Sequence, residues 1–311
     1  MAFRRSRTVC LVGIIAVIAA VPAWPDDSLM DVAASADLGK LVKVTGTGKP
    51  SEKGEGPVPY LAKLSEPPKR VALISFYVSD EGESTGSYYS SVRSFTSLTQ
   101  DGASHFATAY YEKGLAALRE TFSKHGMQVL TSAEFLDTEA KKQAYLASAL
   151  DMSAATKIGL KMIGNMAKAA KGDTKSSAVA AGYRMLPTHQ VPSDPKMAVS
   201  LDGLRKGLGV DALLIVKNGS LSDGGEVRLA DIHIMLYGPN PIPKVEGKSY
   251  IQYKEGQLYV DAILRLKKPA QVAVLQKKGG ISSEEYEGYE KLLAAAAERT
   301  ASHLVEKIKD E

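Results

Sequence analysis

RVALISFYV, at residues 70–78, is an almost unbroken apolar run, and it is the stretch that decides the fold. A strand with one wet face alternates apolar and polar residues, whereas a strand covered on both faces is apolar throughout. We therefore expect residues 70–78 to form a buried central strand of a sheet that is flanked by helices.

The elements after this strand alternate between helix and strand. Residues 106–125 carry large apolar side chains at three- and four-residue steps and stop before Gly126, as an amphipathic helix does. Residues 127–130 indicate a short strand, and Thr131 to Glu134 form a capping box that starts another helix. This order favours a parallel or mixed sheet with right-handed crossovers.

The second half of the chain adds one more strand of this kind and then antiparallel hairpins. We expect Ser200 to cap a short helix before a strand at residues 211–217, and residues 229–237 alternate as a half-exposed strand does. Further strands are expected at Lys248–Tyr253, Gln257–Leu266 and Ala270–Gln276, separated by the breakers Gly256 and Pro269. A capping box at Ser282–Glu285 precedes a long carboxyl-terminal helix with one apolar stripe.

One segment precedes this domain and another interrupts it. Residues 24–68 are rich in turn formers, and we expect a flexible or draped amino-terminal segment there. In the insert at about 137–199 we expect an Ala- and Met-rich helix, residues 152–170, that packs on the core. Alternatively, this helix forms the apolar wall of a binding site or touches a membrane. The fold class is α/β over residues 69–311, with a mixed sheet, this helical insert and a long carboxyl-terminal helix.

The amino terminus has the order of a secretory signal. Arg4, Arg5 and Arg7 precede an apolar run at residues 9–21, and small residues end at Ala23. This run is shorter than the ~20 residues that a membrane-spanning helix needs. We expect cleavage near Ala23 to remove residues 1–23, which makes the protein periplasmic or secreted and leaves it no stable membrane anchor.

Loss of the leader changes the charge and the cysteine content. The whole chain has 39 basic and 35 acidic residues, and removing the three leader arginines leaves 36 basic residues against the same 35 acidic ones. A nucleic-acid-binding protein needs a basic surplus, so we expect no nucleic-acid partner. The single cysteine, Cys10, is also removed, so no disulfide, thiolate chemistry or lipid-modified cysteine is expected.

A similarity to envelope domains is carried by LRKGLGVDALLIV, residues 204–216, together with the strand at 71–78 and the helix that ends in Phe122–Gly126. These features resemble the α/β domain of the curli-secretion lipoprotein, of penicillin-binding-protein activators and of the TolB amino-terminal domain. The resemblance covers roughly residues 69–311 apart from the insert, although this chain lacks a lipid-anchoring cysteine. It implies an accessory or binding role in the envelope without catalysis, and it transfers no functional residues.

Candidate catalytic motifs are few. Gly82 to Gly86 match the nucleophile elbow of serine hydrolases, with Ser84 as nucleophile and His189, His233 or His303 as possible bases. Asp80 and Glu81 separate this motif from the strand, and no His-Gly-Gly oxyanion segment precedes it. We therefore expect no enzyme and keep a serine hydrolase as an alternative. The five histidines are scattered, so we expect no metal and no cofactor.

Recognition residues are expected where the central strands end. The polar stretch 79–105 leaves the carboxyl end of the first strand, an edge where ligands bind in open α/β sheets. The candidate anchors are Tyr88, Tyr89, Arg93 and Phe95, with Lys217 and Asn218 at the end of a second strand.

These features predict an exported, non-enzymatic accessory or assembly factor that binds an envelope protein or a ligand through strand-end loops. The alternative binding role is a small-molecule or lipid carrier. A carrier requires an apolar cavity lined by the Met-rich helix.

Overall fold

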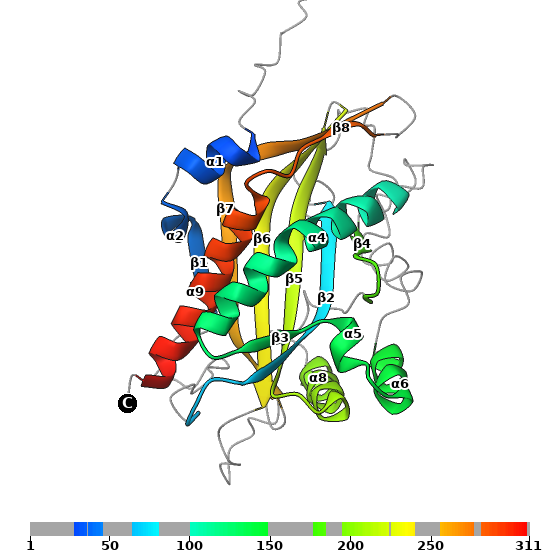
Figure 1. The fold of residues 1–311 in the computed structure, drawn as a ribbon, viewed down its shortest axis with the longest axis vertical. Coiled ribbons are helices and arrows are strands. Elements are labelled where there is room, and N and C mark those ends of the chain that lie inside the picture. Colours follow the sequence, from blue (N-terminus) through cyan, green and yellow to red (C-terminus); the bar gives the residue numbers. More distant parts are fainter. Residues whose placement is uncertain are drawn as a thin grey trace, which may run out of the picture.

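The computed structural model describes residues 28–35, 37–45, 64–80, 100–148, 177–184, 195–223, 225–239, 256–276 and 281–309 (Figure 1). The expected leader, the Met-rich helix at 152–170 and the expected strand at Lys248–Tyr253 lie outside these residues.

The described strands form one mixed sheet of the order β1-β7-β6-β5-β2-β3, with β4 on the free edge of β2 and β8 on β7. The parallel pairs are β2 with β3 and β2 with β5, and the remaining pairs are antiparallel. The fold class predicted from the sequence is thereby confirmed. The strands are β1 (Val42–Thr45), β2 (Arg70–Asp80), β3 (Gln128–Leu130), β4 (Ser177–Val179), β5 (Ala212–Asp223), β6 (Glu226–Pro239), β7 (Gly256–Leu275) and β8 (Ile281–Glu284).

Helices cover both faces of this sheet. Two long helices, α4 (Gln100–Lys124) and α9 (Tyr289–Lys309), lie side by side over one face, which we call the α4/α9 face (Figure 1). The helices α5 (Ser132–Phe135), α6 (Glu139–Ser148) and α8 (Pro195–Leu208) cover part of the other face, which we call the α8 face. The short helices α1 (Leu29–Ser35) and α2 (Leu38–Leu41) pack beside β1, β7 and α9.

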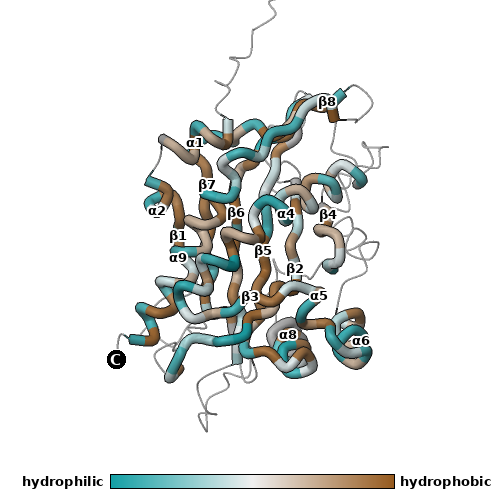
Figure 2. Tube along the Cα trace, in the orientation of Figure 1, coloured by the Kyte–Doolittle hydropathy of each residue, from teal (hydrophilic) through white to brown (hydrophobic). Residues whose placement is uncertain are grey.

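Two apolar cores result from the alternation of side chains along the strands. On β5, Leu214 and Val216 join the core beneath α4 and α9, whereas Leu213 and Ile215 join the core beneath α8. Figure 2 shows the matching hydropathy, with the central strands mostly hydrophobic and the two long helices alternating between hydrophobic and hydrophilic residues. Residues 70–78 are apolar almost without interruption because both faces of β2 are buried.

Several expected boundaries are wrong. Ser200 does not start a helix, because α8 begins at Pro195, and proline suits the first helical turn, where no N–H is needed. Pro269 does not separate two strands. Leu229 pairs with Ala270 while Asp231 pairs with Arg265, so Pro269 lies in a bulge of the continuous strand β7, where its missing N–H costs no ladder bond.

The expected capping box at Ser282–Glu285 is also wrong. Residues 281–284 form β8, and Ser282 Oγ donates a hydrogen bond to the Val274 carbonyl at 3.0 Å. Helix α9 begins only at Tyr289. The Ser-x-x-Glu pattern predicted a helix start, but pairing with β7 satisfies the same backbone groups in an extended conformation.

Part of the amino-terminal segment is paired with the sheet and not flexible. Residues 42–45 form β1 on the edge of β7, and Leu29 of α1 is buried against the carboxyl-terminal helix layer. Residues 28–35 and 37–45 therefore lie draped against the sheet and α9, in place of the flexible segment that was expected.

Candidate functional site

The binding residues expected at strand ends are only partly described. Tyr88, Tyr89, Arg93 and Phe95 lie outside the described residues, as does Ser84. Lys217 and Asn218 are described, but they lie in the middle of β5, which continues to Asp223. Because consecutive strand residues point to opposite faces, the two side chains cannot line one edge together, and that expectation is wrong.

Asn218 is a core residue of the α4/α9 face. Its Nδ2 donates to the Tyr77 carbonyl at 3.4 Å, and its Oδ1 accepts a hydrogen bond of 2.7 Å from the Tyr289 hydroxyl. Burial raises the pKa of Tyr289 well above its usual range, so the phenol remains a donor. Asn218 thus ties β5 to α9 and is closed to a ligand.

Lys217 belongs to a polar row on the α8 face. It lies directly opposite Tyr77 of β2 on one side and His233 of β6 on the other. Directly paired residues of adjacent strands share a face, so the three side chains lie next to one another. We call Tyr77, Lys217, His233 and Asp261 the polar row.

A hydrogen-bonded pair of side chains lies at one end of the polar row. His233 Nε2 is hydrogen-bonded to Asp261 Oδ1 of β7, and the two side chains are only 20% and 15% exposed. Tyr237 lies near this pair, and its pKa is raised by burial, with smaller contributions from the charge of Asp261 and from Tyr77. The polar row therefore combines an imidazole, a carboxylate, an ammonium group and a phenol on one rigid sheet.

The described helices of the α8 face lie beside this row. Leu201, Leu204 and Leu208 of α8 share an apolar core with Leu213 near the start of β5. The same core includes Tyr237 of β6, which is paired with Leu213. The polar row lies further toward the carboxyl end of β5, and α8 is drawn at the opposite end of that strand (Figure 1). Apolar packing thus gives way to polar side chains along this face.

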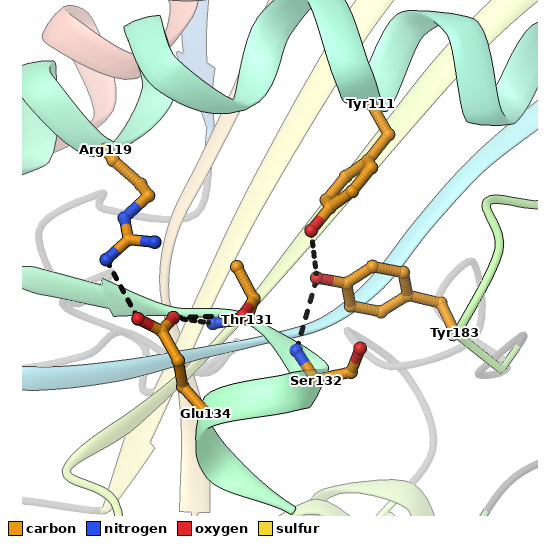
Figure 3. A network of polar contacts seen from close by, with 6 residues as sticks. All are labelled: Tyr111, Arg119, Thr131, Ser132, Glu134 and Tyr183. Carbon is orange, nitrogen blue, oxygen red and sulfur yellow. Dashed lines mark hydrogen bonds and ion pairs between the residues drawn. The ribbon is translucent and has the colours of Figure 1, made fainter.

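A second group of polar residues lies at the carboxyl end of β3, which is paired with the beginning of β2. The connection from β2 to β3 runs through α4 on one face, and the chain that leaves β3 enters α5 on the other face. The Thr131 amide donates to Glu134 at 2.7 Å, which confirms the capping box predicted there (Figure 3). Arg119 of α4 forms an ion pair with Glu134 at 3.0 Å.

Tyr183 lies at this end of β3, between α4 and the start of α5. Its hydroxyl accepts a hydrogen bond from the Ser132 amide at 3.4 Å and donates to the Tyr111 hydroxyl at 3.3 Å (Figure 3). Tyr183 was not predicted as a site residue, because it lies in the insert at about 137–199, where only the helix at 152–170 was expected. The alternating small residues of SAVAAGY, at 177–183, were the available signal for a short buried strand.

Other features of the described residues are limited. No group of three or more His, Cys, Asp or Glu side chains in the described ranges is arranged to hold a metal ion. None of the helices described is both long and apolar enough to cross a membrane. A surface cavity of about 300 Å³ lies between α1, β7 and β8, lined by Ser28, Gln271, Val272, Ala273, Ser283, Glu284 and Glu285. This lining is not the apolar wall that a lipid carrier requires.

Comparisons with protein-family models, with curated proteins and with solved structures find no match for this chain. The fold and the site together define an α/β protein with a mixed sheet, helices on both faces and a polar row across four strands of one face.

Proposed function

We propose that this chain is an exported, non-enzymatic accessory or assembly factor of the cell envelope, which binds a partner protein at the polar row. The leader at residues 1–23 supports export, and the resemblance to envelope α/β domains supports an accessory role. Tyr88, Tyr89, Arg93 and Phe95 follow β2 in sequence, and we propose them as further anchors for the same partner.

The polar row is the observation that carries this proposal. Half-buried charges add little to stability, and apolar side chains of similar volume often stabilise a fold as well or better. Charged side chains gathered beside the apolar core of the α8 face are therefore better explained by recognition than by folding. Side chains on adjacent strands are also held rigidly, which lowers the entropy lost when a partner binds.

Capture from the native envelope fraction tests the proposal. Immobilised mature protein should retain one protein in stoichiometric amount, and Lys217→Gln should lower its affinity by about tenfold or more, the effect of losing a binding hot spot. Lys113→Gln is the matched control, because Lys113 is exposed on α4, which covers the opposite face of the sheet. Circular dichroism establishes that both variants are folded.

Two results would contradict this proposal. Equal retention by the Lys217→Gln variant and by wild type would remove the polar row from binding. A lipid or metabolite that co-purifies in the absence of a protein partner would identify a carrier instead.

The His233–Asp261 pair favours a second candidate, a serine hydrolase. A histidine oriented by a carboxylate is the base half of a catalytic triad, and Ser84 would be the nucleophile. Under the main proposal we expect wild type to hydrolyse p-nitrophenyl esters no faster than His233→Gln or Ser84→Ala. Activity in wild type that both substitutions abolish would establish the hydrolase and overturn the non-enzymatic assignment.

A further inference from the structure

The outer edge of β2 is completed by a segment from elsewhere in the chain. β3 pairs with β2 only at Arg70–Ala72, and β4 pairs with it at Tyr77–Ser79. β4 belongs to the described segment 177–184, which is joined to α6 through residues 149–176 and to α8 through residues 185–194. The edge of β2 thus accepts a short strand, β4, that is about 100 residues distant from it in sequence.

Backbone groups make most of the polar contacts of this segment. The Ala180 amide donates to the Phe76 carbonyl at 2.8 Å, and the Ala181 amide donates to Thr108 Oγ1 of α4 at 3.2 Å. The Arg184 amide donates to the Tyr145 hydroxyl of α6 at 2.9 Å. Backbone contacts of this kind are available to any extended peptide, as in recognition by strand addition.

Three side chains of the segment give the site its selectivity. Ala178 and Ala180 are 1% exposed, so larger residues do not fit there without movement of the walls. Gly182, with a φ of +82°, precedes Tyr183, which reaches Ser132 at the end of β3 and Tyr111 of α4. The Tyr183 ring packs edge-on against Tyr111 with the ring centroids 5.2 Å apart.

This edge adjoins the polar row. Val179 of β4 lies directly opposite Tyr77, which lies opposite Lys217, so a strand in the β4 position extends the polar row by one strand. A partner that adds a strand here would contact the polar row with its neighbouring residues. An internal segment competes at an effective concentration on the order of millimolar, so a partner needs such additional contacts to replace it.

We propose that the edge of β2 beside α4 is an acceptor site for an extended segment of the partner protein, and that residues 177–184 occupy it until the partner arrives. The incoming segment carries small residues at two alternate positions and a tyrosine three residues after the second of them. This inference rests on the proposed function and assigns the way in which the partner binds.

A peptide assay tests the acceptor site without the partner. Fluorescent SAVAAGYR, the sequence of residues 177–184, should bind the Tyr183→Ala variant at least about tenfold more tightly than wild type, because the internal competitor has lost its tyrosine. The same peptide with alanine in place of tyrosine should show no such gain. Leu304→Ala is the control for general loosening, because Leu304 is buried on α9, away from this edge.

A disulfide lock provides a test that leaves the segment in place. Ser79 and Ser177 are paired across β2 and β4, so the double variant Ser79→Cys, Ser177→Cys can join the two strands. In the capture experiment, the oxidised variant should lose the partner, and reduction should restore binding.

The outcomes separate the two proposals. An oxidised variant that binds the captured partner as well as wild type does would overturn the acceptor site and leave the proposed function standing. If capture yields no partner, the proposed function fails, and the peptide assay alone decides the acceptor site. Equal peptide binding by wild type, Tyr183→Ala and Leu304→Ala would overturn it.

Discussion

Replacing Tyr289 with alanine is expected to lower the free energy of unfolding by about 4 kcal/mol, the largest effect of any single substitution considered for this chain. Tyr289 is fully buried between α9 and the sheet, and its ring lies 4.5 Å from the ring of Tyr110, centroid to centroid. Alanine would leave a cavity in the α4/α9 core. It would also leave Asn218 Oδ1 without the hydroxyl that donates to it.

Urea denaturation followed by circular dichroism measures this loss. Tyr289→Phe is the control, because it keeps the ring and removes only the hydroxyl, at an expected cost of about 1 to 2 kcal/mol. The two values together separate packing from hydrogen bonding. A Tyr289→Ala variant that unfolds within 1 kcal/mol of wild type, a limit set well below the ordinary cost of truncating a core aromatic, would contradict the packing of α9 described here.

Replacing Gly288 with alanine is expected to cost about 3 kcal/mol and to release the amino-terminal helix α1. Gly288 has a φ of +92°, a conformation that side chains disfavour. A Cβ at this position would lie 2.8 Å from the Leu29 carbonyl oxygen and 2.9 Å from the Met30 Cα. These are backbone atoms, so α1 itself must move, and Leu29 would lose its burial.

Hydrogen exchange of residues 28–45, measured by mass spectrometry, reports this release directly. Gly203→Ala is the matched control, since Gly203 is helical and its Cβ would meet no atom within 4 Å. We expect no loss of stability there, because alanine favours the helix. Unchanged exchange in the Gly288→Ala variant would show that α1 does not depend on this close approach.

Sequence patterns predicted which helices and strands are present more accurately than they predicted the residues at which these elements begin and end. The apolar run at 70–78 predicted a strand buried on both faces, and β2 is such a strand. The Thr131–Glu134 pattern correctly predicted a helix start, but the similar Ser282–Glu285 pattern lies at an edge strand. Local signals identify a helix start only when no neighbouring strand competes for the same backbone groups.

The candidate site was predicted less well than the fold. Lys217 stays a prediction as a binding residue, but Asn218 beside it is a core residue, because the strand continues past the point where its apolar run ends. His233 was considered only as a catalytic base, and nothing in its sequence neighbourhood indicated Asp261 as its partner. Pairs across antiparallel strands depend on register, which hydrophobic alternation alone specifies only in part.

The sequence by itself determined the α/β class, the buried central strand, the antiparallel second half and the long carboxyl-terminal helix. Each of these follows from the period of apolar residues within one segment, which requires no knowledge of the rest of the chain. The tertiary structure alone decided that Tyr77, Lys217, His233 and Asp261 lie together, and that residues 177–184 complete the edge of β2. Those contacts join residues far apart in sequence, and strand order and register bring them together.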